Sequence, residues 1–251
     1  MQFSRWHALG NSYLVVEQPD AGLLTPARVQ RLCSVETGIG SDGVLEVTER
    51  DGTHAVVTIW NPDGSTAEMS GNGVRIAARW LAAETGTTEV SIETAGRRIS
   101  ARMLGALEVD TNVGAFIVGE PEVIDGIELT TASVGNPHAV IRLDEPTRDD
   151  LLRLGPLVET HARFPERTNV QLVRVDGPHE LTVLVWERGA GETSASGSSS
   201  VAAAAVAVKR GWCESPVTVH LPGGDLQVRI ADGIASLTGP AERISRGSTA
   251  L

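Results

Sequence analysis

An internal duplication constrains the fold of this chain more than any other feature of its sequence. When the chain is aligned with itself, TIWNPDGSTAEMSGNGVRIAARW falls on LVWERGAGETSASGSSSVAAAAV, which pairs Trp60 with Trp186 and Ser70 with Ser196. Two further pairs of segments follow in the same order, Gly10-Asn11 with Gly135-Asn136 upstream and residues 90–101 with residues 217–228 downstream. Three anchors in one order indicate two copies of a single structural unit.

Both copies predict the same succession of elements: a β-rich segment, a glycine-rich polar loop, an alanine-rich helix and a hairpin. In the first copy, the apolar residues of 56–59 are typical of a strand, and residues 74–83 contain helix formers without a breaker. In the second copy, residues 181–186 predict a strand and residues 199–209 a helix that ends before Gly211. The small alanine side chains would let such a helix lie close to a surrounding sheet.

The predicted fold class is α/β of the α+β type, with two similar lobes related by a pseudo-twofold axis. Each lobe is expected to be a curved β-sheet wrapped around a central helix. We expect an N-terminal lobe of residues 1–114 plus about 238–251 and a C-terminal lobe of residues 115–237, because Gly114 and Gly119 interrupt the pattern between the copies. The final segment, GPAERISRGSTAL, is expected to return to the first lobe as a strand or tail.

The composition is that of a folded chain that binds neither nucleic acid nor a membrane. The 251 residues carry 21 Lys and Arg against 32 Asp and Glu, a net charge of −11, with no basic run that could hold a phosphate backbone. The longest apolar stretch, residues 201–208, is far shorter than the about 20 residues that span a bilayer. The segment MQFSRWHALGNSY lacks the charged and apolar regions of a secretory signal, so the expected location is cytoplasmic.

No sequence pattern predicts a metal or a cofactor. The six histidines form no i, i+4 pair, no CxxC accompanies them, and the glycine-rich loops lack the lysine and spacing of nucleotide-binding loops. Lys209 is not in a setting that suggests a Schiff base. The two cysteines, Cys33 and Cys213, are too few for a disulfide framework and lie in apolar, helix-like settings typical of buried free thiols.

Ser70 and Ser196 stand at equivalent positions of the duplication. Each precedes a glycine at the start of a predicted helix, where unpaired N–H groups and the positive end of the helix dipole can hold a carboxylate. Serine is also a common N-cap, so either serine taken alone could be structural. Two equivalent loops facing each other would place matched groups on opposite sides of one carbon, as inversion of a stereocentre requires.

Six motifs occur along the chain in this order: ALGNSY, LCSVETGIGSDGVL, NPDGSTAEMSGNGVR, VGNPHAV, FPERTNVQLV and WERGAGETSASGSSS. In order and spacing they resemble those of the diaminopimelate epimerase family, and the resemblance runs from about residue 3 to residue 247. It implies a two-domain, cofactor-independent isomerase that interconverts L,L- and meso-diaminopimelate on the route to lysine and peptidoglycan. It also implies a small amino-acid substrate and a possible homodimer.

The resemblance further implies which residues bind the substrate. The side chains that would contact it are all polar or charged: Asn11, Asn61, Asn136, Asn169, Glu187 and Arg188. The helix-start loops would supply N–H donors to the α-carboxylate at Gly71, Asn72, Gly197 and Ser198. Arg188 could bind the remote carboxylate through two parallel hydrogen bonds, and Glu187 could pair with an ammonium group.

The chain departs from the family at the two catalytic cysteines, because Ser70 and Ser196 stand at those positions. A thiol ionises near pKa ~8.5 and an aliphatic hydroxyl is close to water at about 15.7, a deficit of about 7 units or on the order of 9–10 kcal/mol. A helix dipole supplies up to ~2 kcal/mol, so a serine can act only if a neighbour takes its proton. The available neighbours are Glu187 and, as a possible assisting base, His138, which is equally well explained as a structural residue beside Pro137.

Three functions stay open from the sequence. The first is a diaminopimelate epimerase with serine at both acid/base positions, whether natural or substituted. The second is a related isomerase or lyase that acts on another amino acid, and the third is a binding protein that keeps the pocket without turnover. The retained recognition residues favour diaminopimelate as the ligand in the first and third, and only turnover separates these two.

Overall fold

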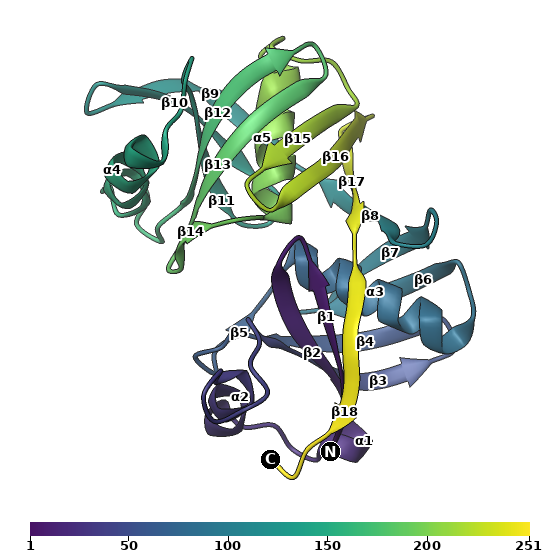
Figure 1. Ribbon diagram of the computed structural model, residues 1–251. Helices are drawn as coiled ribbons and strands as arrows, with labels where there is room; N and C mark the ends of the chain where they lie inside the picture. Colours follow the sequence, from purple (N-terminus) through teal and green to yellow (C-terminus); the bar gives the residue numbers. More distant parts are fainter. The chain divides into compact units, whose positions relative to one another are not determined.

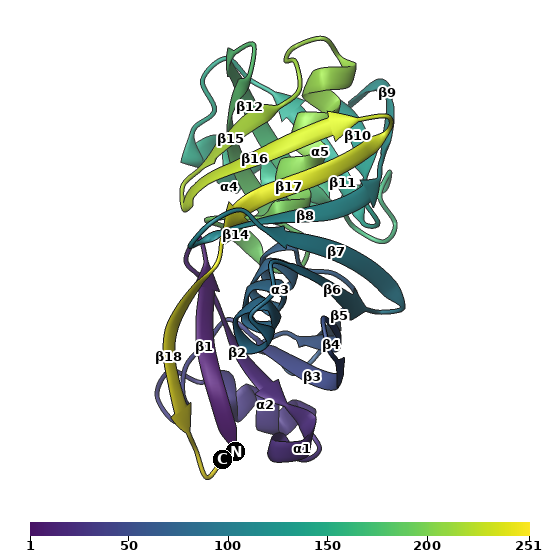
Figure 2. The same cartoon turned by 90° about the vertical axis from the view of Figure 1, so that its right-hand side faces the viewer.

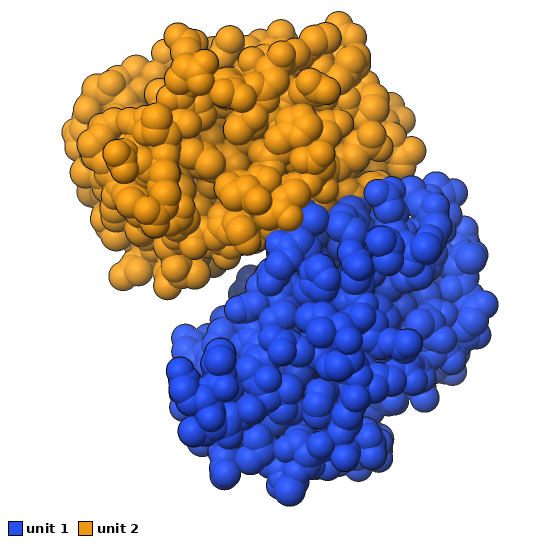
Figure 3. Space-filling view, viewed as in Figure 1, with its two compact units in different colours: residues 1–111, 239–251 blue, residues 112–238 orange.

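The computed structural model describes residues 1–251, which divide into two compact units (Figure 3). Unit 1 comprises residues 1–111 with 239–251, and unit 2 comprises residues 112–238. Each unit is rich in strands and contains one long central helix, α3 (Gly71–Thr85) in unit 1 and α5 (Gly197–Lys209) in unit 2 (Figure 1). No helix of the chain is both long and apolar enough to cross a membrane.

The remaining elements are strands and three further helices, α1, α2 and α4. In unit 1 they are β1 (Gln2–Ala8), β2 (Asn11–Glu17), α1 (Gln18–Ala21), α2 (Pro26–Cys33), β3 (Val44–Asp51), β4 (His54–Trp60), β5 (Thr66–Ala67), β6 (Glu89–Thr94), β7 (Arg97–Met103), β18 (Glu242–Ser248) and the first half of β8 (Glu108–Ala115), whose residues 112–115 belong to unit 2. In unit 2 they are β9 (Ile117–Ile124), β10 (Ile127–Ser133), β11 (Pro137–Arg142), α4 (Arg148–Glu159), β12 (Asn169–Gly177), β13 (Glu180–Glu187), β14 (Gly191–Thr193), β15 (Val217–Leu221), β16 (Gly224–Ala231) and β17 (Ile234–Pro240), whose residues 239–240 belong to unit 1.

The two units have the same strand order, which confirms the duplication seen in the sequence. The order is β18-β1-β2-β3-β4-β6-β7-β8 in unit 1. In unit 2 it is β9-β10-β11-β12-β13-β15-β16-β17. The parallel pairs are also equivalent, β2–β3 and β4–β6 in unit 1 and β11–β12 and β13–β15 in unit 2. Because parallel neighbours need a crossover, α3 and α5 connect equivalent pairs of strands.

The central helices occupy the alanine-rich segments that predicted them. α3 begins after Ser70 and is followed by Gly86, whose left-handed φ of 69° favours glycine. α5 begins after Ser196, and Gly211 takes the left-handed conformation just beyond its end. Most residues of both helices are buried, as expected for a helix with a curved sheet around it (Figure 2).

The strand β2 shows how the sheet of unit 1 separates two cores. Tyr13 and Val15 pack in the cluster around α3, whereas Leu14 and Val16 pack in the cluster of α2. Side chains of a strand alternate between the faces of its sheet, so one apolar run contributes to both cores. In unit 2, α4 packs against β12 and β13 in the equivalent way.

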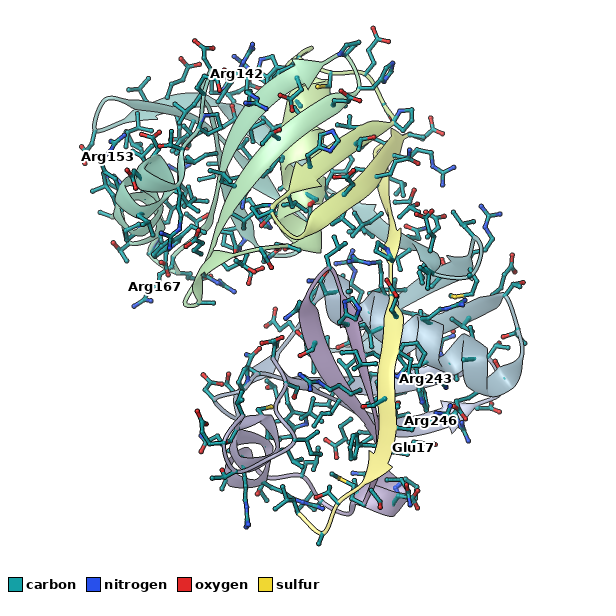
Figure 4. The ribbon with its side chains drawn as sticks, in the orientation of Figure 1. Glu17, Arg142, Arg153, Arg167, Arg243 and Arg246 are labelled. Carbon is teal, nitrogen blue, oxygen red and sulfur yellow. The ribbon has the colours of Figure 1, made fainter.

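The C-terminal strand β18 belongs to unit 1, where it pairs antiparallel with β1. Arg243 of β18 lies over the ring of Trp6, 5.8 Å from its centroid, and Arg246 forms an ion pair with Glu84 of α3. Both arginines are labelled along the strand in Figure 4. The last strand is therefore held by a neighbouring strand and by the central helix.

Gly155 gives the sharpest test of packing in unit 2. A Cβ added to this residue of α4 would lie 2.6 Å from both Cγ and Cδ2 of Trp186. We expect Gly155→Ala to lower the free energy of unfolding by about 1–3 kcal/mol, although alanine is intrinsically the better helix former by about 1 kcal/mol. Urea unfolding followed by circular dichroism measures the change.

The matched control is Arg153→Ala, at an exposed position of the same helix. Its free energy of unfolding should change by less than about 0.5 kcal/mol. An equal or higher stability of Gly155→Ala would contradict the close approach of α4 to Trp186.

Candidate active site

Ser70 is the N-cap of α3, and its side chain holds the first turn of that helix. Its Oγ accepts a hydrogen bond from the Gly73 N–H at 3.0 Å. A Cβ at position 73 would lie 3.2 Å from that Oγ, so glycine keeps this contact uncrowded. Gly71 and Asn72 follow at the first helical positions, whose N–H groups have no partner within a helix. Ser70 thus has the capping role that is common for serine at a helix start, and it lies beside a set of N–H donors.

The hydroxyl of Ser70 has a second partner, Tyr13 of β2. The Oη of Tyr13 lies 3.2 Å from the Oγ of Ser70, and either oxygen can be the donor. The Tyr13 side chain is buried in the cluster around α3. Tyr13 was not among the predicted site residues, although it stands within the ALGNSY motif. Ser70 therefore lies between its own helix start and a buried phenol.

Asn72 connects the same loop to Asn11 and to a buried arginine. The Nδ2 of Asn72 donates to Asn11 Oδ1 at 3.2 Å, and its Oδ1 accepts from Arg75 at 2.7 Å. Arg75 is fully buried and also donates to the Gly71 carbonyl, while its Nε has no partner. Burial lowers the pKa of Arg75 to about 10, so the guanidinium is still cationic at neutral pH. The structure brings Asn11 and Asn72 together beside a positive charge that the sequence prediction missed.

Asn61 is used by the turn between β4 and β5. Its N–H donates to the Ser65 carbonyl, its carbonyl accepts from the Gly64 N–H, and its Nδ2 donates to Ser65 Oγ at 2.9 Å. An asparagine that stabilises a turn in this way is the structural alternative expected for N-P-D-G.

Ser196 is the N-cap of α5 but, unlike Ser70, makes no capping bond with its side chain. Its hydroxyl is instead hydrogen-bonded to the carboxyl of Glu187, the last residue of β13. Ser196 is buried, and burial raises the pKa of Glu187 even though the bond to Ser196 acts in the other direction. Gly197 and Ser198 are the first two residues of the helix. A carboxyl of raised pKa beside a hydroxyl is an arrangement suited to proton transfer.

His138 is fully buried, and both of its ring nitrogens are occupied. Nδ1 accepts from Gln171 Nε2 at 3.1 Å, and Nε2 donates to Asn136 Oδ1 at 2.9 Å. Gln171 also donates to Ser199 Oγ. Burial, assisted by the charge of Arg188, lowers the pKa of His138 to about 3.

A ring of such low basicity with no free nitrogen is a poor proton acceptor. The possible role of His138 as an assisting base therefore does not fit this geometry. The structural alternative does fit, because the ring fixes the orientation of the Asn136 amide.

Asn169 holds two backbone segments of unit 2 together. Its Nδ2 donates to the Pro137 carbonyl at 2.9 Å, and its Oδ1 accepts from the Arg188 N–H at 3.0 Å. The Arg188 side chain is exposed, and its guanidinium donates to the Glu166 carbonyl at 3.4 Å. Asn169 thus holds the backbone of Arg188 directly after the end of β13. The guanidinium of Arg188 stays accessible to an anion.

The two cysteines are buried and free, as the sequence predicted. Cys33 lies beside Ser41 at the end of α2, and Cys213 lies beside the Gly177 carbonyl. Burial raises the pKa of both thiols, which makes them poor nucleophiles. No group of three or more His, Cys, Asp or Glu side chains is placed to hold a metal ion.

Comparison with known proteins gives matches along nearly the whole chain. The family described as diaminopimelate epimerase matches residues 3–117 and 130–244. Diaminopimelate epimerase 2 of Nostoc sp. is 39% identical over 98% of this chain and 95% of its own length. The diaminopimelate epimerase of Desulfitobacterium hafniense is 35% identical over 98% of this chain and 97% of its own.

Solved structures show the same fold at low sequence identity. A predicted epimerase from Pseudomonas aeruginosa matches with a TM-score of 0.77 and 18% identity, over 100% of this chain and 99% of its own. A hydroxyproline epimerase from Agrobacterium vitis, with bound trans-4-hydroxy-L-proline, matches with a TM-score of 0.73 and 16% identity, over 98% and 90% of the two chains.

The raised pKa of Glu187 makes the stability of the protein depend on pH. The folded state holds this proton more tightly than the unfolded state, whose carboxyl pKa is about 4.3, so stability is lost as the pH rises above that value. We therefore expect Glu187→Gln to be more stable than the parent near pH 7, and the gain to shrink towards zero near pH 4. Urea unfolding at several pH values measures the difference.

Glu192→Gln is the control of opposite sign, since the bond to Arg148 lowers the pKa of Glu192. This variant should lose a little stability near pH 7. If Glu187→Gln is no more stable than the parent near pH 7, the pKa of Glu187 is not raised in the folded state.

Proposed function

Since the chain belongs to the diaminopimelate epimerase family, we propose that it interconverts L,L- and meso-diaminopimelate without a cofactor, with Ser70 and Ser196 as its acid and base residues. An amino-acid epimerase removes the α-proton from one face of a carbon and returns a proton to the other face. The observation that carries the proposal is the hydrogen bond between the buried Ser196 and the half-buried Glu187, because it supplies what a hydroxyl needs in order to act as a base.

Ser196 and Glu187 would act together as the base. As the Oγ of Ser196 takes the α-proton, its own proton passes to the Glu187 carboxylate, so no free alkoxide forms. In the opposite direction the carboxyl returns its proton to Oγ, and Oγ protonates the carbanion. Because burial raises the pKa of Glu187, its carboxylate is a stronger base than an exposed one.

The carboxylates of the substrate would bind at helix starts and at an arginine. The N–H groups of Gly71 and Asn72 in unit 1 and of Gly197 and Ser198 in unit 2 are the proposed donors to the α-carboxylate. The buried charge of Arg75, bonded to Asn72, adds to the positive potential at the start of α3. The exposed guanidinium of Arg188 is the proposed bidentate donor to the remote carboxylate.

The amide side chains would complete the recognition of the substrate. Their proposed role is to offer both donors and acceptors to its amino and carboxylate groups, and they are Asn11, Asn61, Asn136 and Asn169. Asn136 would do so with an amide whose orientation His138 sets. A cytoplasmic location, a homodimer and the absence of a nucleic-acid partner are part of the same proposal, and the acidic charge of −11 supports the last of these.

Incubation with L,L-diaminopimelate in deuterated water tests the proposed function. We expect the meso isomer to form with deuterium at the inverted α-carbon, because the returned proton comes from a group that exchanges with solvent. Chiral separation followed by mass spectrometry measures both. Ser196→Ala should reduce the rate about 10²-fold or more.

The other outcomes identify the alternatives. Binding of diaminopimelate without deuterium uptake would mean a binding protein. Uptake with a different amino acid, and none with diaminopimelate, would mean a related isomerase or lyase.

The role of Arg188 is tested by binding. We expect Arg188→Ala to weaken the affinity for diaminopimelate about 10²-fold or more, because two charge-assisted hydrogen bonds to the remote carboxylate are lost. Isothermal calorimetry measures the affinity, with Arg153→Ala as an exposed arginine control in the same unit. Unaltered affinity in Arg188→Ala would reject its assignment.

A further inference from the structure

We propose that Tyr13 is a positioning residue that acts through Ser70, holding the proton that Ser70 exchanges with the substrate. The proposal rests on the epimerase function given above and adds the group that lets a hydroxyl act in unit 1. It starts from the direct contact between the two side chains, Oη to Oγ at 3.2 Å.

The backbone of Gly43 fixes the ring of Tyr13 in this place. A Cβ on Gly43 would lie 2.5 Å from Cε1 of Tyr13 and 2.5 Å from the Trp60 carbonyl oxygen. Only a hydrogen atom at position 43 therefore allows the ring to lie where it does. Tyr13 itself is 6% exposed and belongs to the cluster around α3, so the phenol is aimed at the helix start by rigid packing.

A count of donors and acceptors shows that the pair can work in both directions. The Gly73 N–H occupies one lone pair of Ser70 Oγ, which leaves its hydrogen and a second lone pair. If the Tyr13 phenol donates to that lone pair, the Ser70 hydrogen is free to go to the substrate. If Tyr13 is a phenolate, the Ser70 hydrogen points to it, and the lone pair of Oγ is free to take a proton. The heavy atoms need not move between the two states.

Each transfer is balanced in protons and charge. To protonate a carbanion, the Ser70 O–H bond breaks, its proton goes to the α-carbon, and the Tyr13 O–H bond breaks to replace it, which leaves a phenolate. To remove an α-proton, the phenolate takes the Ser70 proton while Oγ takes the proton from carbon. Ser70 is a neutral hydroxyl before and after both steps, so its own poor acidity is bypassed.

The magnitude of the effect decides whether this partner is sufficient. A phenol has a reference pKa of ~10 and a thiol ~8.5, a difference of about 1.5 units, whereas an isolated hydroxyl lies about 7 units above the thiol. The phenol therefore closes most of the deficit that serine creates. The N–H groups at the start of α3 further favour negative charge at this point.

The surroundings contain few other groups that could titrate with Tyr13. The neighbouring strands present no titratable side chain beside Tyr13 on this face of the sheet, where Ser4, Trp6 and Ala8 of β1 and Leu45 and Val47 of β3 lie. His7 and Glu46 of the same strands alternate to the opposite face, where His7 accepts from the Gly10 N–H and Glu46 from Trp60 Nε1. From α3, the buried charge is Arg75, which donates to Asn72.

The two units would then contribute opposite partners for proton transfer. A carboxyl is a stronger acid than a phenol, so in this scheme Glu187 is the partner suited to accept a proton and Tyr13 the partner suited to supply one. Activity should accordingly fall at high pH, as Tyr13 loses the proton that Ser70 must pass on.

The experiment uses the fact that Tyr13 is the single tyrosine of the chain. Growth on 3-fluorotyrosine replaces this residue alone with a phenol of lower pKa and the same hydrogen-bonding atoms. Deuterium uptake into diaminopimelate is then measured against pH for both proteins. We expect the alkaline limb of the profile to move to lower pH by the difference between the two phenol pKa values.

Tyr13→Phe is the companion variant. We expect its rate of exchange to fall about 10²-fold or more, with the fall in kcat rather than in KM. Grown on 3-fluorotyrosine, this variant contains no fluorotyrosine and should keep its own profile, which controls for the growth medium. If Tyr13→Phe does not fold, the fluorotyrosine protein, which keeps the hydroxyl, still decides the question.

The outcomes separate this proposal from the proposed function. The role of Tyr13 is overturned if the fluorotyrosine protein exchanges with the same alkaline limb as the parent. It is also overturned if Tyr13→Phe exchanges at a rate within threefold of the parent. In both cases the epimerase function still holds. No exchange in the parent protein overturns both.

Discussion

The start of a buried helix is the constraint on which the rest of each unit depends. A helix that is apolar on nearly all sides is stable only with a sheet around it, and its first turn presents N–H groups without helical partners. Both α3 and α5 begin with a serine as N-cap and a glycine as the first helical residue. The fold therefore creates a place for an anion in each unit before any catalytic side chain is considered.

The two serines differ in what else holds them. Ser70 caps its helix through Gly73 and contacts the Tyr13 phenol, whereas Ser196 makes no capping bond and contacts the Glu187 carboxyl. In both units a titratable group lies against a hydroxyl that is too weak an acid to act alone. Under the proposed function, chemistry that a thiol performs by itself is shared here between a hydroxyl and its neighbour.

The sequence was sufficient to predict the duplication and the two central helices because their signals are local or repeated. The duplication aligned Ser70 with Ser196, and the alanine-rich segments predicted helices that form at Gly71–Thr85 and Gly197–Lys209. Burial of the two free cysteines followed from their apolar settings. These features need no knowledge of which strands become neighbours.

The partners of the site residues could not be predicted in the same way, because they depend on tertiary register. In the sequence, Tyr13 is one member of an apolar run typical of a strand, and only the packing of β2 against α3 shows that its hydroxyl lies at the helix start. The low pKa of His138 likewise follows from complete burial among Gln171 and Asn136, which a motif cannot reveal. Arg75 lies inside a predicted helix, and its link to Asn72 was visible only as a spacing of three residues.

The most direct test of the account is a double-mutant cycle on Tyr13 and Ser70, measured as deuterium exchange at the α-carbon of diaminopimelate near neutral pH. A thiol at position 70 can ionise without a partner. We therefore expect Tyr13→Phe to reduce exchange about 10²-fold or more in the parent protein and less than about tenfold in the Ser70→Cys background. Equal losses in the two backgrounds would contradict it, because they would show that the phenol does not supply what the hydroxyl lacks.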